Sequence, residues 1–339
     1  MVAKSASAAT AALGVSGYGF GLFGYSNPAW IVPLAILIII LVTGVVLSGI
    51  RRTNMVNMIV VGITLVSLGF FVIGGTPVIL EKGLSNLIPL QGNQEISYSN
   101  MISGVLHATA LMFVAYTGYG RVATLGEEIV DPRQNLPRAI RITLGLTIFI
   151  YAVVLFVAIS AVGHESLYEA ARGDSATLVA AANEYGIAGS AVYVGIGAVT
   201  AMLGVLLNLI LGLSRMVLAM SRRGHFPAIF SNVDKKGVTP IPAVLFTGVL
   251  VLVLSLFGDV YVTWSLSAFT VLIYYGITNW AAIRLDDSKR MYARHWAWIG
   301  LFGCLLLAFW VEQEYWVLGL GLIVIGLIWY AVTKPREKA

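Results

Sequence analysis

The stretch Met101–Arg141, MISGVLHATALMFVAYTGYGRVATLGEEIVDPRQNLPRAIR, decides how the rest of the chain is interpreted. Its apolar part, ahead of the glycines, is shorter than the ~20 residues that a membrane-crossing helix needs. Tyr116-Thr117-Gly118-Tyr119-Gly120 follows, with two glycines among aromatic residues. Unwound backbone at membrane depth survives only where it is buried in protein or lines a cavity. We therefore predict a broken helix at Tyr116–Gly120 whose open ends face a small polar ligand.

The composition predicts an all-α integral membrane protein. Hydrophobic residues make up 58% of the chain and charged residues 11%, whereas a soluble domain carries about 25% charged residues. Apolar, charge-free runs predict about ten crossings, one of which is the broken span. The other nine predicted crossings cover residues 5–25, 30–50, 54–77, 142–163, 187–214, 238–258, 260–283, 296–311 and 315–333.

The positions of the charges predict the orientation. When these crossings are threaded, all 21 Lys and Arg residues except Lys82 and Arg172 fall on one side of the membrane. This is the positive-inside pattern, and it predicts a multi-pass protein of the plasma (cytoplasmic) membrane with both termini cytoplasmic. The net charge of +5 is therefore explained by basic residues that orient the protein in the lipid bilayer, and no nucleic-acid partner is predicted.

The sequence contains no motif for catalysis or for a bound metal. Gly19-x-Gly21-x-x-Gly24 matches a dinucleotide-binding string, but no strand precedes it and no βαβ unit can form in a membrane span. Cys304 is the only cysteine, so neither a disulfide within the chain nor a thiol–metal cluster can form. His107 lies inside a crossing, where it is either a functional group or a neutral side chain bonded to a neighbouring helix. The sequence does not decide between these two roles.

The ends of a broken helix carry unpaired carbonyl and amide groups, and the dipoles of its two halves favour opposite charges. A zwitterion such as an amino acid supplies both charges. Its ammonium is expected on the carbonyls of Val114, Ala115 and Thr117, and its carboxylate on half-helix amides. The alternative is a glycine kink that only aids packing. The predicted substrate-binding residues are Val114, Ala115, Tyr116, Thr117, Gly118 and Tyr119.

Two acidic residues follow at the inner end of this span. Glu127 and Glu128 are candidates for a cytoplasmic gate that pairs with Arg215 or Arg222. The alternative is a solvated helix end, and the spacing alone favours that alternative.

Two motifs carry a family resemblance. The run Phe113–Tyr119, followed by GEEIVDP at 126–132 and NLPRAI at 135–140, resembles the sixth helix and following loop of amino acid permeases. These belong to the amino acid–polyamine–organocation (APC) superfamily. Ser214-Arg215, AMSRRG at 219–224, Pro227 and Thr239-Pro240 resemble that family's eighth helix and the loop to its ninth.

The resemblance implies an inverted-repeat (LeuT-like) transporter fold. The ten crossings would correspond to helices three to twelve of the family, so the chain is expected to be an N-terminally truncated permease or to have a misplaced start. The implied organisation is one helical membrane domain, 1–339. It would comprise an incomplete first repeat (1–77), a complete second repeat (101–284) and two appended helices (296–333).

Two departures from the family concern the site and its coupling ion. Many relatives have an acidic residue where this chain has Gly120. Thr64 stands where proton-coupled relatives often keep a lysine, whose ammonium can replace a sodium ion. Thr64 is therefore a candidate for the coupling-ion site. Coupling to Na⁺ or H⁺, or exchange without an ion, stays open, and no other cofactor is expected.

The resulting prediction is secondary active transport of amino acids by alternating access around Tyr116–Gly120, as an antiporter or symporter. Tyr116 or Tyr119 would cover the substrate. The alternative is a transport-inactive permease fragment or a membrane interaction protein. A membrane enzyme has no supporting motif, and the sequence does not indicate an oligomeric state.

Overall fold

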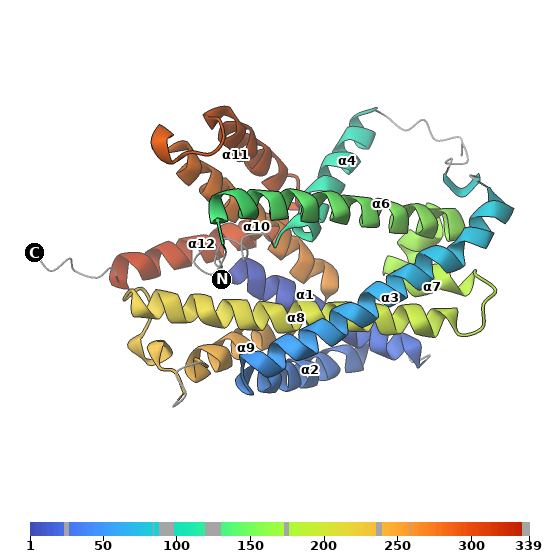
Figure 1. The fold of residues 1–339 in the computed structure, drawn as a ribbon, viewed down its shortest axis with the longest axis horizontal. Helices are drawn as coiled ribbons and strands as arrows, with labels where there is room; N and C mark the ends of the chain where they lie inside the picture. The colour runs from blue at the N-terminus through green and yellow to red at the C-terminus, as the bar shows by residue number, and fades with distance from the viewer. Residues whose placement is uncertain are drawn as a thin grey trace, which may run out of the picture. The chain divides into compact units, whose positions relative to one another are not determined.

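The computed structural model describes residues 1–23, 27–83, 85–87, 98–118, 130–172, 176–234, 239–257 and 259–333. These residues form helices joined by turns, without a β-strand, so the predicted all-α fold is confirmed (Figure 1). The helices are α1 (Val2–Leu22), η1 (Pro28–Trp30), α2 (Ile31–Leu47), α3 (Ile50–Lys82), η2 (Ser85–Leu87), α4 (Tyr98–Met112), η3 (Phe113–Tyr116), α6 (Pro132–Arg172), α7 (Thr177–Asn183), α8 (Ser190–Arg222), η4 (Ala228–Ser231), α9 (Ile241–Ser255), α10 (Val260–Ile283), η5 (Asp287–Lys289), α11 (Arg294–Ala308) and α12 (Gln313–Thr333).

A helix lies at each of the predicted crossings. Six helical segments among the described residues are long and apolar enough to span a membrane, and they correspond to α3, α4 with η3, α6, α8, α10 and α12. The helices α2, α9 and α11 are apolar but shorter. The helix α1 covers the first predicted crossing and is not among these six segments. The chain is therefore a multi-pass helical membrane protein.

Helix α6 differs from the sequence prediction. The crossing was predicted from residue 142, but the helix already begins at Pro132, a position where proline's fixed φ suits the first turn. It also continues beyond a kink at Gly163, whose φ is +81°. The short helix α7 then forms between the predicted crossings 142–163 and 187–214. These helical extensions contain polar residues, and a search for apolar runs does not detect them.

The chain folds as two compact units, each assembled from segments that are distant in sequence. One unit comprises Met1–Thr10, Glu95–Thr117 and Leu209–Ala339; the other comprises Ala11–Gln94 and Gly118–Asn208. In the first unit, α10 packs against α11 and α12, and α4 contacts both α10 and α11. In the second unit, α3 packs against α6 and α7. The predicted organisation into repeats stays a prediction.

Polar side chains join α3 to α8 in the second unit. Asn208 donates a hydrogen bond to the Asn57 side chain, and the Thr64 and Thr200 hydroxyls lie 3.2 Å apart. Ser67 donates to the Tyr193 carbonyl at 2.9 Å. Such bonds between helices in a membrane contribute about 0.6–2 kcal/mol each. They fix the rotation of α8 against α3.

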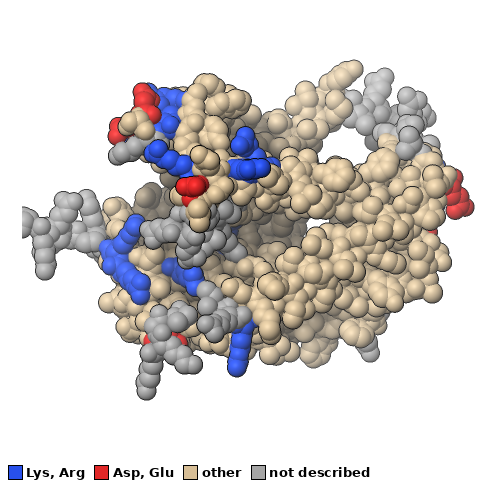
Figure 2. Space-filling view, in the orientation of Figure 1, with Lys and Arg blue, Asp and Glu red and all other residues tan. Residues whose placement is uncertain are grey.

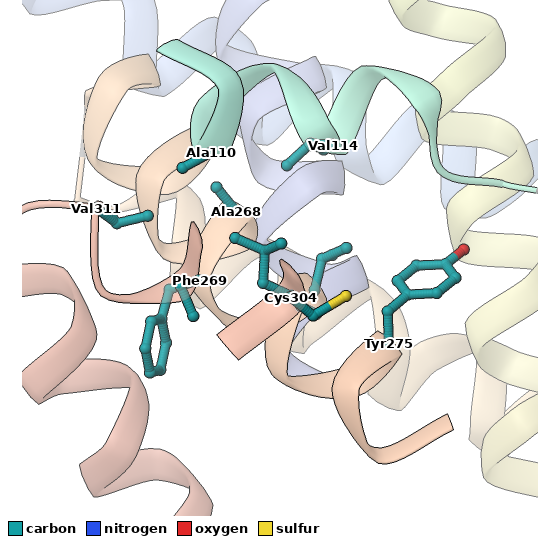
Figure 3. Packing of buried hydrophobic residues seen from close by; sticks show 11 residues of the cluster. Ala110, Val114, Ala268, Phe269, Tyr275, Cys304 and Val311 are labelled. Atoms are coloured by element: carbon teal, nitrogen blue, oxygen red, sulfur yellow. The ribbon is translucent and has the colours of Figure 1, made fainter. Parts of the chain in front are cut away.

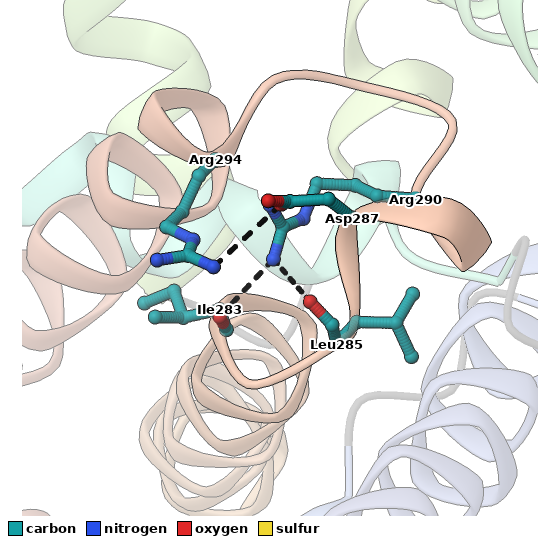
Figure 4. Close-up of polar contacts among 5 residues, drawn as sticks. All are labelled: Ile283, Leu285, Asp287, Arg290 and Arg294. Atoms are coloured by element: carbon teal, nitrogen blue, oxygen red, sulfur yellow. Dashed lines mark hydrogen bonds and ion pairs between the residues drawn. The ribbon is translucent and has the colours of Figure 1, made fainter.

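The C-terminal end of α10 is held by Arg290, which comes from the following loop. Its guanidinium donates to the carbonyls of Ile283 and Leu285 and pairs with Asp287, to which Arg294 is also bonded (Figure 4). The last carbonyls of a helix lack intrahelical partners, and a cation there is stabilised by the helix dipole. Arg290 therefore closes the helix that supports the candidate site described below.

The surface is largely uncharged. In Figure 2 uncharged side chains cover most of the visible face, and acidic and basic side chains gather at a few places. Large apolar side chains point outward from the long helices, including Val66 on α3, Phe149 on α6 and Ile325 on α12. Exposed apolar faces of this extent mark contact with lipid or protein. They match a helical protein whose solvent is the bilayer.

Gly75 on α3 allows α3 to pack closely against α6 and Tyr185 in the second unit. A substitution at this position therefore tests the fold. A methyl group at Gly75 would overlap Val157 of α6 and would lie 2.9 Å from the Tyr185 hydroxyl. Burial raises the pKa of the Tyr185 phenol above its usual value. This aromatic side chain is itself buried and cannot easily move aside.

We expect Gly75→Ala to lower the melting temperature of the purified protein by roughly 2–10 °C, because overpacking costs about 1–3 kcal/mol. Gly69→Ala on the same helix is the control, since a methyl group there meets nothing within 4 Å among the described residues. Equal melting temperatures for the two variants would contradict this packing.

Candidate functional site

The predicted broken span ends its helical backbone at Tyr116. The α-helix α4 tightens at Phe113 into the 3₁₀ turn η3, and Thr117 follows in an extended conformation, with φ −91° and ψ 153°. Gly118 has φ +145°, a region that favours glycine. The chain therefore leaves the helix at the end of the apolar segment Tyr98–Tyr116, which is longer than the sequence predicted and long enough to cross a membrane. The predicted second half-helix lies in residues 119–129, outside the described part of the chain.

Two carbonyls near this helix end are bonded to protein donors. The Val114 carbonyl accepts from the Thr117 amide at 3.1 Å and from the Thr117 hydroxyl at 2.7 Å. The Leu111 carbonyl accepts from the Trp264 indole at 3.0 Å. A carbonyl oxygen has two lone pairs, so the two hydrogen bonds from Thr117 occupy both acceptor positions of the Val114 carbonyl. A ligand ammonium must therefore bind other groups than the Val114 carbonyl in this conformation.

Helix α10 is the platform on which this helix end rests. Ala110 and Val114 are buried and face Ala268 of α10 in a core that also contains Cys304 of α11 (Figure 3). The Phe113 ring packs edge-on against Tyr275, with ring centroids 5.6 Å apart. Val114, predicted as a ligand-contacting residue, thus points its side chain into the core. Its backbone carbonyl is already bonded to Thr117.

The start of α1 is fixed to the same platform by hydroxyl groups. Ser7 and Ser267 lie 2.6 Å apart, and Thr10 donates to Thr263 at 2.8 Å. Ser267 also donates to the Ala3 carbonyl at 3.1 Å. Alanines on α1 are almost fully buried, and such small residues allow the close approach of helices that is typical of membrane proteins.

This packing brings Lys4 to the helix end. The Lys4 ammonium donates to the Thr117 hydroxyl at 3.3 Å. A cation at the C-terminal end of a helix is stabilised by the dipole of the peptide groups. From the sequence, Lys4 is only one of the basic residues expected on the inner side. A charged residue next to a run of alanines is unusual at the start of an apolar helix and could have marked Lys4 as a candidate. Nothing in the sequence, however, links Lys4 to Thr117.

The other predicted substrate-binding residues are placed only in part. Ala115 and Tyr116 are half-buried in η3, and Gly118 is exposed. Tyr119 lies outside the described residues, as do Gly120 and the gate candidates Glu127 and Glu128. Arg215, the third gate candidate, is an exposed residue of α8 in the first unit.

Thr64, the candidate for the coupling ion, is a half-buried residue of α3 in the second unit. Its hydroxyl donates to the Val60 carbonyl at 2.9 Å, and the Thr200 hydroxyl donates to the Gly197 carbonyl at 2.9 Å. If both hydroxyl hydrogens are used in this way, the oxygen lone pairs of Thr64 and Thr200 face each other. Facing oxygen atoms are suitable ligands for a hard cation.

Comparisons with known proteins identify relatives over nearly the whole chain. The family described as amino acid permease matches residues 2–338. A transporter of Mycobacterium tuberculosis is 34% identical over 334 residues, which cover 98% of this chain and 72% of that protein. A cationic amino acid transporter of Arabidopsis thaliana is 29% identical over 229 residues, covering 67% of this chain and 36% of that protein. A large neutral amino acids transporter small subunit of Rattus norvegicus is 27% identical over 288 residues, which cover 82% of this chain and 51% of that protein.

The positive φ at Gly118 generates a test of the candidate site. We expect Gly118→Leu to lower the binding of labelled amino acids to the purified protein about tenfold or more, because a side chain in this region of φ costs about 1–3 kcal/mol. Gly104→Leu on α4 is the matched control, since the space at Gly104 is open among the described residues. Both variants should remain in the membrane. Unchanged binding in Gly118→Leu would argue against a site at this helix end.

Proposed function

Since the chain belongs to the amino acid permease family, we propose that it moves amino acids across the cytoplasmic membrane as a secondary transporter. Alternating access would occur around the helix end at Tyr116. The observation that carries this proposal is the change from helix to extended backbone at Thr117, directly after the apolar helical segment Tyr98–Tyr116. Such backbone is tolerated at membrane depth only where it is enclosed by protein or lines a cavity. Half-helix ends of this kind bind substrates in secondary transporters.

The groups that the site recognises are proposed to be those that all amino acids share. The relatives include transporters named for cationic and for large neutral amino acids. Substrates with such different side chains have the α-ammonium and α-carboxylate in common. Recognition through backbone groups and Lys4 would therefore hold the shared part of the substrate.

Lys4 is proposed to contact the substrate carboxylate. Its ammonium lies at the C-terminal end of η3, 3.3 Å from the Thr117 hydroxyl, and α1 is fixed to α10 by buried hydroxyl contacts. A positive charge held in this way is pre-organised for an anion. The substrate ammonium would use carbonyls of the helix end other than that of Val114, which Thr117 satisfies.

Three further parts of the prediction remain proposals. Tyr116, half-buried at the end of η3, would cover the bound substrate, with Tyr119 as the alternative. Glu127, Glu128 and Arg215 would form the cytoplasmic gate. The Thr64 and Thr200 hydroxyls, 3.2 Å apart on α3 and α8, would be ligands for a coupling Na⁺.

The experiment that tests transport is exchange in proteoliposomes. Vesicles that contain the purified chain and unlabelled amino acids should take up labelled amino acids above the level of empty vesicles. A panel of acidic, neutral and basic amino acids identifies the substrate. If no member of the panel exchanges, the chain is a transport-inactive membrane protein, and the proposed function is wrong.

Lys4→Met and Lys4→Arg then test the carboxylate contact. Lys4→Met is expected to raise the KM for exchange about tenfold or more, because it removes a charge-assisted hydrogen bond of about 1.5–3 kcal/mol. Lys4→Arg keeps the charge and should retain part of the affinity. The same KM for Lys4→Met as for the wild type would show that Lys4 does not bind the substrate.

Sodium dependence tests the role of Thr64. Replacing Na⁺ with N-methyl-D-glucamine should slow uptake by the wild type, and Thr64→Ala should remove this dependence by deleting one of two facing hydroxyl oxygens. Ser67→Ala is the control, because Ser67 bonds a backbone carbonyl of α8 instead. Equal uptake with and without Na⁺ in the wild type would instead favour proton coupling or exchange without an ion.

A further inference from the structure

A cluster of titratable side chains lies where α4 meets α10 and the turn between α11 and α12. His107 comes from α4, Tyr261 from the first turn of α10, and Glu312 from the α11–α12 turn. All three belong to the same compact unit. The proposed transport mechanism does not use them. They join the half-helix that ends at Tyr116 to its supporting platform.

The hydrogen bonds fix the protonation of one imidazole nitrogen. The His107 Nδ1 lies 2.9 Å from the Trp310 carbonyl oxygen. A carbonyl only accepts hydrogen bonds, so Nδ1 carries the hydrogen atom. In the neutral imidazole, the lone pair is therefore on Nε2.

The surroundings of Nε2 are acceptors. Nε2 lies 3.6 Å from Oε1 of Glu312 and 3.4 Å from the Tyr261 hydroxyl oxygen. The Tyr261 hydroxyl donates its hydrogen to the Glu312 carboxylate. The other carboxylate oxygen, Oε2, is buried and has no hydrogen-bond partner among the described residues. A neutral Nε2 thus faces oxygens that do not donate to it, whereas a protonated Nε2 would donate to the carboxylate.

The other charged groups on the elements around His107 are mainly acidic. The basic groups of α11 are confined to its first turn. Asp259 caps α10 and accepts from the Tyr261 amide at 2.7 Å. The first turn of α12 carries Glu314 and Tyr315, and the Tyr261 and Tyr315 rings are 6.1 Å apart. Helix α11 contributes the buried Cys304 thiol to the core beneath α4. The basic side chains of α11 are Arg294 and His295, and both are in its first turn.

We propose that His107 is a proton-operated latch on the half-helix. When Nε2 takes up a proton, His107 becomes a donor to Glu312, and α4 is fixed to α10 and to the α11–α12 turn by a charged pair. The Trp264 bond to the Leu111 carbonyl is a second tether on the same helix. His107 is a positioning residue, since it lies roughly 15 Å along the helix from Thr117 at 1.5 Å per residue.

The latch would make transport sensitive to pH, and this part of the inference rests on the proposed function. Alternating access requires the two sides of a site to change position. A contact that stabilises one arrangement lowers the population of the other. Acid favours the protonated imidazole, which donates hydrogen bonds from both ring nitrogens. Acidification should therefore strengthen the latch and slow turnover, with little effect on KM.

The first experiment is amino acid exchange with the same pH inside and outside the vesicles, so that no proton gradient drives uptake. The wild type is expected to turn over about fivefold more slowly at pH 5.5 than at pH 7.5, a typical size for coupling between sites. His107→Gln can still form hydrogen bonds but cannot take up a proton, and it should remove this difference. His295→Gln on α11 is the matched control and should keep the wild-type profile. A pH profile of His107→Gln that equals the wild type would overturn the proposal.

A second experiment tests the latch without transport. The melting temperatures of the wild type, His107→Gln, Glu312→Gln and the double variant form a double-mutant cycle. At pH 5.5 the two substitutions should be non-additive by about 2 °C or more, and at pH 8 they should be additive. Additive effects at both pH values would overturn the latch. If exchange fails for every amino acid while the cycle shows coupling at pH 5.5 only, the proposed function is wrong but the latch is supported.

Discussion

The requirement that backbone polar groups find partners without water governs the region around Tyr116. An unpaired amide or carbonyl in hydrocarbon costs several kcal/mol, so a helix cannot end there unless other groups satisfy it. In this protein one partner is local and the others come from distant parts of the sequence. Thr117 turns back on the Val114 carbonyl, Trp264 donates to the Leu111 carbonyl, and Lys4 bonds to Thr117. Thr117, together with Trp264 of α10 and Lys4 of α1, supplies these contacts.

Helix α10 serves both the site and the proposed latch. Its buried face packs against Ala110 and Val114, its hydroxyls hold the start of α1, and Tyr261 in its first turn meets Glu312. Its opposite end is closed by Arg290. In the proposed latch, this helix with contacts at both ends would transmit a change at His107 to the backbone at Thr117. The same helix holds Lys4 beside the helix end.

His107 shows how one residue can fulfil two alternatives that the sequence left open. It is bonded to a neighbouring element, as expected of a structural histidine, through Nδ1 and the Trp310 carbonyl. Its other nitrogen faces a carboxylate at 3.6 Å, which a purely structural role does not require. Because the two nitrogens are distinct, the first contact sets the tautomer and the second leaves a position for a proton.

The sequence by itself determined the membrane class, the positions of the long helices and the family. These follow from local properties: apolar runs of spanning length, the motif around Tyr116 and the loop after it. The predicted 260–283 crossing coincides with α10, because its apolar run has sharp boundaries. The extensions of α6 beyond Gly163 and back to Pro132 were missed, because polar helical turns do not differ from loops in hydropathy.

Only the tertiary structure decided which side chains meet. Lys4 and Thr117 are 113 positions apart in the sequence, and His107 and Glu312 are 205 apart. No periodicity within a helix encodes such a contact, because it depends on how helices rotate and cross when buried faces pack. The sequence predicts the Val114 carbonyl as a ligand group, and only the fold shows that Thr117 bonds to this carbonyl twice. Local sequence sets where a helix can end, and packing between helices sets what its ends bind.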